Sequence, residues 1–415
     1  MVCSLERWLY KKSIGRTTAL ENYFRQLQPF LIHGIAVTAG VVFHFAVVRL
    51  LGVKEAGVFF SSFAMYSVFL MLSLFGQQKG LISSLYFKNG GNFGFVLKNI
   101  FLGWFTAVLF WQAFVPNVPD VFIFAALLSA VVASLGVYYQ YLRRFFIGSV
   151  FQQYGVRIGA LLLIALAGSN SSVGLSYALL VSAAIFVSIG FLFLPRPRGG
   201  SVTPLTMGNL SHRSLLPYWA ISVLTTLSDA APIYLAAVIS EPEFAAILAI
   251  VIKVAALGSF ALVAVNKFSI VSYAARPQDR VFLQKKSARY GFGACLVAIP
   301  IFLTLFYCAE SILEFFSANL SSNGDLLRWC LLPHLVNVFT GQSATLLMVA
   351  GRVDITLRHQ FVAAGVLLSL CLMALQSGSS ALLVAALIVP PIINSVLNLI
   401  AARMLLGFWS VVRLP

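Results

Sequence analysis

The sequence predicts an all-α polytopic membrane protein with about twelve transmembrane helices in two groups of six. Hydrophobic residues make up 60% of the 415-residue chain, charged residues only 10%, and the mean hydropathy is +0.94. Soluble domains carry charge on roughly a quarter of their residues. Apolar runs of about 20 residues, each long enough for one bilayer crossing, recur along the chain. Basic residues gather in every second connection between these runs, as in multi-pass proteins.

The first two spans form a hairpin with a short turn. Residues 29–49 and 57–76 are mainly apolar, and the stretch 50–56 between them contains glycine and two charges. Arg49, at the edge of this turn, is open to two interpretations: a helix-end anchor, or part of the outer rim of a substrate cavity. The twelve predicted spans are 29–49, 57–76, 96–115, 120–140, 148–168, 173–194, 214–237, 243–264, 288–308, 326–349, 359–376 and 380–402.

Charge predicts the topology. The net charge of +16 is interpreted by position relative to the spans, and we expect no nucleic-acid partner. The connections on one side hold 23 of the 28 Lys and Arg residues, the opposite loops hold three, and two lie within spans. This bias places both termini and the basic loops in the cytoplasm.

A polar linker divides the predicted helices into two groups. The basic segment before the first span is either a helix lying on an anionic membrane surface or a solvated tail. A 6+6 arrangement of repeats is common among transporters. The predicted units are a cytoplasmic segment at 1–28, six-helix bundles at 29–198 and 214–404, a linker at 199–213 and a cytoplasmic tail at 405–415.

Several short motifs resemble one family of membrane proteins. The stretch from Arg49 to Phe60 (RLLGVKEAGVFF) is similar to the opening hairpin of polysaccharide-type flippases, the Wzx or RfbX group of the multidrug/oligosaccharidyl-lipid/polysaccharide (MOP) exporter superfamily. A weak internal repeat of this hairpin matches Glu55 with Glu243 and Gly57 with Ala245. Further similarity to the superfamily lies at Arg143-Arg144, at 236–252 and at 347–352 (LMVAGR).

The resemblance implies a MATE/MOP-like fold, with two six-helix bundles around a central lumen in the bacterial inner membrane. It also implies a substrate, an undecaprenyl-pyrophosphate-linked oligosaccharide such as an O-antigen repeat unit, moved by alternating access from the cytoplasmic to the periplasmic leaflet. Membrane lipid, a polysaccharide polymerase and chain-length proteins would be the other partners. We expect no cofactor beyond coupling to a proton or sodium gradient. The cations discussed next belong to no fixed family motif and are not inherited from it.

Two cations lie inside predicted spans, where ionisable side chains usually face a bundle interior or a water-filled cavity. Arg157 follows Gln153 by one helical turn, so both can face the lumen. A guanidinium can hold a phosphate through two parallel hydrogen bonds. The alternative is that Arg157 extends to the cytoplasmic surface. Lys253 lies in the middle of its span, where it either attracts pyrophosphate or pairs with Asp229.

The seventh span carries the clearest polar stripe. Tyr218, Ser222, Thr225 and Asp229 are spaced by four, three and four residues and therefore share one helical face. Asp229 has three interpretations: coupling to protons or cations, hydrogen bonding to sugar hydroxyls, and pairing with Lys253.

Other spans contribute polar groups that suit sugar recognition or helix packing equally well. His33 and His44 are eleven residues apart, about three turns, and are coupling candidates, although a membrane histidine is more often a packing contact. The remaining substrate-binding candidates are His334 and Asn337 in the tenth span and Tyr66 in the second.

The sequence carries no motif for catalysis or for a metal. We find no glycine-rich phosphate loop, helical zinc-binding pattern or nucleophile elbow. An organic-cation antiporter of the same superfamily would need lumen carboxylates, and only Asp229 qualifies. A polysaccharide-polymerising or modifying enzyme would need a large periplasmic loop, and the outer loops are short. The flippase is therefore the favoured function.

Overall fold

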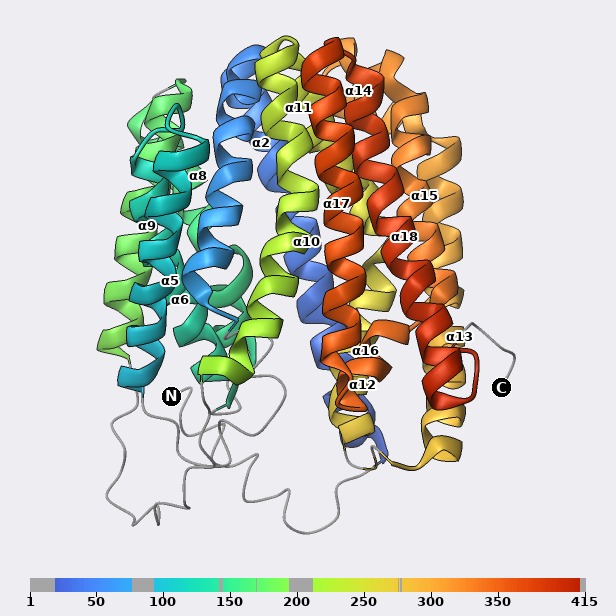
Figure 1. Ribbon diagram of the computed structural model, residues 1–415. Helices are drawn as coiled ribbons and strands as arrows, with labels where there is room; N and C mark the ends of the chain where they lie inside the picture. Colours follow the sequence, from blue (N-terminus) through green and yellow to red (C-terminus); the bar gives the residue numbers. More distant parts are fainter. Residues whose placement is uncertain are drawn as a thin grey trace.

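The computed structural model describes residues 19–76, 93–141, 145–168, 170–193, 212–274, 276 and 278–410, and these ranges contain helices and connecting turns but no strand. Figure 1 shows the helices side by side in one bundle. Nine of them are long and apolar enough to cross a membrane, by the length and composition of the described residues. The chain is a multi-pass membrane protein.

The first helix, α2 (Ala19–Leu74), is the predicted hairpin of two spans. It reverses direction at Gly52, where φ is 77° and ψ is 164°. Glycine adopts positive φ without the steric cost that a Cβ brings. The first leg therefore precedes Gly52, and the second leg follows it.

The next four spans lie close to their predicted positions. The fifth span is not a uniform helix: a π-helical turn precedes α8, and such turns are frequent at functional sites. The elements are α5 (Phe93–Phe114), α6 (Val121–Tyr141), α7 (Phe145–Ser149), the π-helix η1 (Val150–Tyr154), α8 (Gly155–Ala167) and α9 (Ser172–Leu192).

The second half repeats the long-helix pattern with two shorter outer elements. Its elements are α10 (His212–Ile239), α11 (Pro242–Ala255), η2 (Ala256–Ser259), α12 (Phe260–Ala274), α13 (Arg280–Tyr307), α14 (Ala309–Phe316), η3 (Ala318–Asn323), α15 (Gly324–Thr340), α16 (Ser343–Val349), α17 (Val353–Ser377) and α18 (Ser380–Leu406).

The prediction of one continuous helix at 326–349 is wrong, because the chain breaks at Gly341 (φ 69°, ψ −141°). A Cβ at this position would lie 2.4 Å from the Ser410 carbonyl oxygen, so the C-terminal segment occupies the space beside the break. The side-chain amide nitrogen of the next residue, Gln342, donates to Asn266 Oδ1 (2.9 Å) and to the Ser269 hydroxyl (2.7 Å). This buried network stabilises the interruption.

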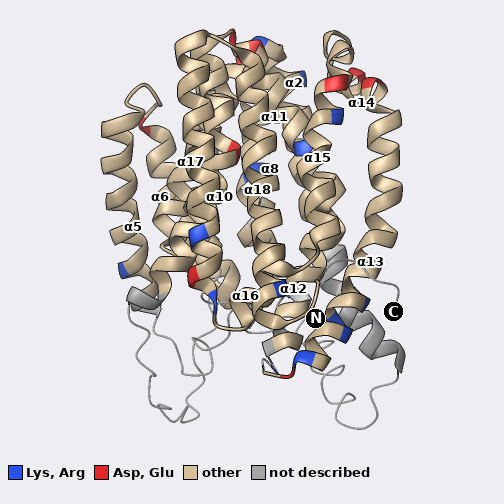
Figure 2. Cartoon of the chain, turned by 45° about the vertical axis from the view of Figure 1, so that its right-hand side comes forward, with Lys and Arg blue, Asp and Glu red and all other residues tan. Residues whose placement is uncertain are grey.

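Charge distinguishes the two ends of the bundle (Figure 2). We call the end that carries α14 the acidic end and the opposite end the basic end. The membrane side of each end stays a prediction. Three predicted segments also stay predictions: the N-terminal segment 1–28, the linker 199–213 and the tail 405–415. Much of each lies outside the described part of the chain, at residues 1–18, 194–211 and 411–415.

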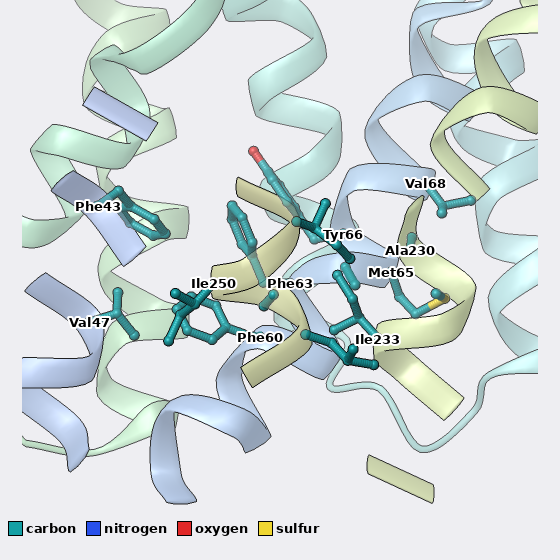
Figure 3. Close-up of a cluster of buried hydrophobic side chains, with 14 of the residues drawn as sticks. Phe43, Val47, Phe60, Phe63, Met65, Tyr66, Val68, Ala230, Ile233 and Ile250 are labelled. Carbon is teal, nitrogen blue, oxygen red and sulfur yellow. The ribbon is translucent and has the colours of Figure 1, made fainter. Parts of the chain in front are cut away.

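The two halves meet through α2. It packs mainly against α10 and α11, and also against α12. In this interface Phe60 lies beside Ile250, and Met65 lies near Ala230 and Ile233 (Figure 3). Near the basic end the Trp219 indole N–H donates to the backbone carbonyl of α2 at 3.1 Å.

A second contact between the halves lies at the acidic end. The Phe45 ring stacks on Phe315 of α14 with centroids 4.6 Å apart. Arg49 donates to the Phe315 carbonyl oxygen at 2.9 Å, and its guanidinium lies 5.4 Å from the Phe45 ring centroid. Arg49 thus contacts the other half of the protein, a role that neither sequence interpretation contained.

Gly57 lies where the α2 hairpin closely approaches the start of α11 at Pro242. A Cβ there would lie 1.8 Å from the Pro242 carbonyl oxygen. We predict that Gly57→Ala lowers the free energy of unfolding by about 1–3 kcal/mol, as overpacking does. The thermal unfolding midpoint of the purified protein in detergent measures this change.

The control is Gly293→Ala, since nothing lies within 4 Å of a Cβ at this helical position. Alanine should stabilise that helix by about 0.5–1 kcal/mol. Equal midpoints for both variants would contradict the close approach at Gly57.

Candidate functional site

Five ionisable side chains from five helices converge at the centre of the bundle. We call Arg157, Lys253, Asp229, His44 and His334 the central charged cluster. Lys253 of α11 lies within electrostatic range of each of the other four. The cluster therefore combines residues of α2 and α8 with residues of α10, α11 and α15, from both halves of the chain.

The cluster lies about ten residues from the helix ends at the acidic end, a depth that we expect to be close to the middle of the membrane. At 1.5 Å per residue, a distance of ten residues corresponds to about 15 Å, half of a hydrocarbon core of about 30 Å. Counted from the helix ends at the acidic end, Arg157 lies ten residues before Ala167, Asp229 ten before Ile239, His334 ten after Gly324 and Lys253 eleven after Pro242.

Arg157 does not extend to the basic end. Its guanidinium lies over the Phe63 ring, 5.4 Å from the centroid. No hydrogen bond or ion pair involves this guanidinium within the described part of the chain. A cation–π contact stabilises the charge without using any of the five N–H donors, so these donors stay available to a ligand.

Asp229 and Lys253 attract each other electrostatically but form no direct ion pair. The ion pairs within 4.0 Å among the described residues involve Arg328, Glu310 and Asp325 at the acidic end. Asp229 is solvent-exposed. Because an ionised carboxylate in a membrane span usually faces water, we expect this part of α10 to line a water-filled cavity.

The two cluster histidines are held through Nδ1. His44 is buried, stacks on Phe60 with centroids 4.7 Å apart and donates from Nδ1 to the Gly40 carbonyl at 2.8 Å. His334 Nδ1 lies 3.1 Å from the Ser259 hydroxyl, whose own hydrogen is donated to a backbone carbonyl. Nδ1 of His44 therefore carries the proton, because a carbonyl oxygen can only accept, and Nδ1 is the His334 nitrogen that contacts Ser259.

The predicted stripe on α10 lies on the helix face that carries Asp229. Thr225 is exposed like Asp229 one turn away, and Tyr218 and Ser222 are half-buried. The Ser222 and Thr225 hydroxyls donate to the carbonyls four residues back, at 2.8 and 2.6 Å. Their oxygen lone pairs can still accept hydrogen bonds from a ligand.

The remaining site candidates from the sequence differ in burial and in whether the structure describes their side chains. Tyr66 is buried, lies within electrostatic range of Arg157 and donates to the Ser129 hydroxyl at 2.8 Å. Asn337 is half-buried on α15, one turn from His334. The side chains of His33 and Gln153 lie outside the described part, so their roles stay predictions.

Sequence reasoning missed the aromatic residues that support the cluster. The Phe63 ring lies beneath the Arg157 guanidinium and stacks on Tyr66 with centroids 5.1 Å apart. The Phe60 ring stacks on His44. Ser259, which holds His334, was missed as well. The signal was present in the four aromatic residues within 59–66, but aromatic residues in a membrane helix ordinarily indicate packing.

Comparisons with known proteins identify the fold. No family model and no curated protein matches the sequence. The inward-facing structure of a multidrug resistance MATE family transporter of the MOP superfamily matches with a TM-score of 0.55 at 12% identity, over 91% of this chain and 94% of that chain. The outward-facing structure of a multidrug resistance MATE family transporter of the MOP superfamily matches with a TM-score of 0.54 at 14% identity, over 92% of this chain and 95% of that chain.

A third structure, the Vibrio cholerae MATE transporter VcmN in its bent form, gives a TM-score of 0.52 at 14% identity, over 92% of this chain and 96% of that chain. At these identities the likeness establishes the fold. The prediction of an all-helical, MATE/MOP-like membrane protein is confirmed.

The cluster can bind an anion. Arg157 and Lys253 lie within electrostatic range of each other and have no direct counter-ion among the described residues, in a region where a charge costs several kcal/mol. An anionic ligand would relieve their repulsion and receive hydrogen bonds from both.

Cysteine labelling tests the cavity. In a background without the native cysteines, we expect Thr225→Cys and Asp229→Cys to react with a charged methanethiosulfonate at least ~10-fold faster than Ala230→Cys, because a thiol must reach water to react. Ala230 is only 3% exposed. Equally slow labelling at 229 and 230 would place Asp229 outside a water-filled cavity.

Proposed function

We propose that this protein transports an anionic lipid-linked oligosaccharide across a bacterial inner membrane, from the leaflet at the basic end to the leaflet at the acidic end. One observation carries the proposal: Arg157 and Lys253 lie together at mid-membrane depth with no direct counter-ion among the described residues. The substrate class is an undecaprenyl-pyrophosphate-linked repeat unit.

Pyrophosphate matches the two cations. Arg157 offers a planar fork of donors that binds two phosphate oxygens at once, and Lys253 supplies a compact charge with three donors. Hydrogen bonds to charged groups contribute about 1.5–3 kcal/mol each. The pair therefore favours a ligand that carries two adjacent negative groups over a neutral lipid.

The sugar moiety would meet the polar face of α10. Thr225 and Ser222 present acceptor lone pairs, and Tyr218 lies on the same face. Hydroxyl acceptors of this kind suit sugar hydroxyls and tolerate different sugars.

Asp229 is the coupling candidate that the geometry supports best. Its side chain is exposed and has no ion-pair partner within 4.0 Å in the described part of the chain. A proton or a sodium ion bound there would change the charge beside Lys253 and thereby the affinity for an anionic substrate. His44 is a weaker candidate, because it is buried under Phe60.

The proposed cycle is alternating access. Contacts between the halves rest on α2, which packs against α10 and α11. Rocking about these contacts would expose the cluster to each side in turn. A polysaccharide polymerase and chain-length proteins are the proposed downstream partners.

A second function, export of organic cations, is favoured by the exposed carboxylate of Asp229 and by the MATE fold. The balance of two cations against one carboxylate argues against it. We expect that expressing the protein in a strain without efflux pumps leaves ethidium resistance unchanged. Resistance that rises and is lost in Asp229→Asn would support the second function instead.

Replacing the central lysine tests the first function in cells. In a strain that lacks the gene, Lys253→Ala should give surface polysaccharide reduced by at least ~10-fold, the loss expected for a charge-assisted hydrogen bond. Lipid-linked repeat units should accumulate in the same cells. Quantitative immunoblotting and lipid analysis measure the two effects.

Lys253→Arg, which keeps the charge, should retain part of the activity. Lys54→Ala is the matched control, because Lys54 is exposed at the acidic end, away from the cluster. Normal polysaccharide in a stably inserted Lys253→Ala variant would remove Lys253 from the transport site.

A further inference from the structure

An apolar groove of about 360 Å³ lies between the first leg of α2 and α8. The two elements are neighbours on one side of the bundle (Figure 1). One face of α2 from Ile35 to Phe43 lines the groove, together with Ile158 and Leu161 of α8. Ile35 and Val42 are 50% and 53% exposed, so the groove is open along its length.

The inner side of the groove adjoins the central charged cluster. Leu161 lies one helical turn after Arg157 and therefore on the same face of α8. Phe43, which is fully buried, packs edge-on against the His44 ring at 5.6 Å between centroids. Phe43 also lies 5.4 Å from Phe63, the ring that carries the Arg157 guanidinium.

The apolar groove therefore adjoins the central charged cluster. A molecule with an anionic headgroup and a long hydrocarbon chain matches both parts at once. An anionic headgroup that lacks a hydrocarbon chain would contact only the cluster, and bulk membrane lipid would then fill the groove.

We propose that the groove between α2 and α8 holds the isoprenoid chain of the same lipid whose pyrophosphate is bound by Arg157 and Lys253. The inference rests on the proposed function and adds to it the path of the lipid chain. The chain leaves the cavity sideways into the bilayer between these two helices, while the headgroup stays in water.

Displacement of radiolabelled inorganic pyrophosphate from the purified full-length protein in nanodiscs tests the proposal. Farnesyl pyrophosphate should displace the label at a concentration at least ~10-fold lower than unlabelled pyrophosphate does, because burial of only two methylene groups already corresponds to about tenfold in affinity. Val42→Trp should remove this advantage and leave the affinity for pyrophosphate itself unchanged.

Thr38→Trp, at a second exposed position of the groove, should act in the same way. The matched control is Leu162→Trp. Leu162 is 60% exposed on α8 and does not line the groove, so this variant should behave as wild type.

The outcomes separate the two proposals. If pyrophosphate binds and depends on Lys253, but farnesyl pyrophosphate has no advantage or keeps it in both groove variants, the groove proposal is overturned and the proposed function stands. If pyrophosphate binding is absent or unchanged in Lys253→Ala, the proposed function fails and the groove proposal fails with it.

Discussion

The arrangement of this protein depends on holding two uncompensated cations in the middle of a membrane. A charge at this depth costs several kcal/mol unless water, a ligand or an aromatic ring stabilises it. Arg157 lies on Phe63, and Lys253 is half-exposed near the exposed carboxylate of Asp229. We therefore expect water to reach the cluster, whose residues include members of α2 and of α10 and α11, the helices against which α2 packs.

The α2 hairpin contributes residues both to the central charged cluster and to the contacts with the second half of the chain. Its two legs carry His44 and the ring beneath Arg157, and the same legs pack against α10 and α11. At the acidic end, Gly57 allows the hairpin to approach Pro242, and Arg49 bonds to α14. Movement of this hairpin relative to α10 and α11 would therefore displace residues of the cluster and the contacts at the acidic end together.

Much of the fold follows from the sequence, because span length and loop charge are set by the bilayer. Eleven of the twelve predicted spans coincide with helical segments, and the span at 326–349 is divided into α15 and α16. The break at Gly341 escaped prediction, because it depends on Ser410 and Gln342 reaching the same place from distant parts of the chain. For the cluster, polarity inside apolar spans identified the charged members. The supporting rings, the missing Asp229–Lys253 ion pair and the contact of Arg49 with α14 depend on three-dimensional packing, which helical periodicity does not contain.

The most direct test of the central claim is ³¹P–¹⁵N distance-dependent NMR on the protein in bilayers, with pyrophosphate bound and ¹⁵N in the lysine side chains. We expect dephasing of the phosphorus signal by an ammonium nitrogen, since charge-assisted hydrogen bonds bring nitrogen and oxygen to about 2.7–2.9 Å. This dephasing should disappear in Lys253→Met and persist in Lys54→Met. A bound phosphorus signal whose dephasing is unchanged in Lys253→Met would contradict the claim.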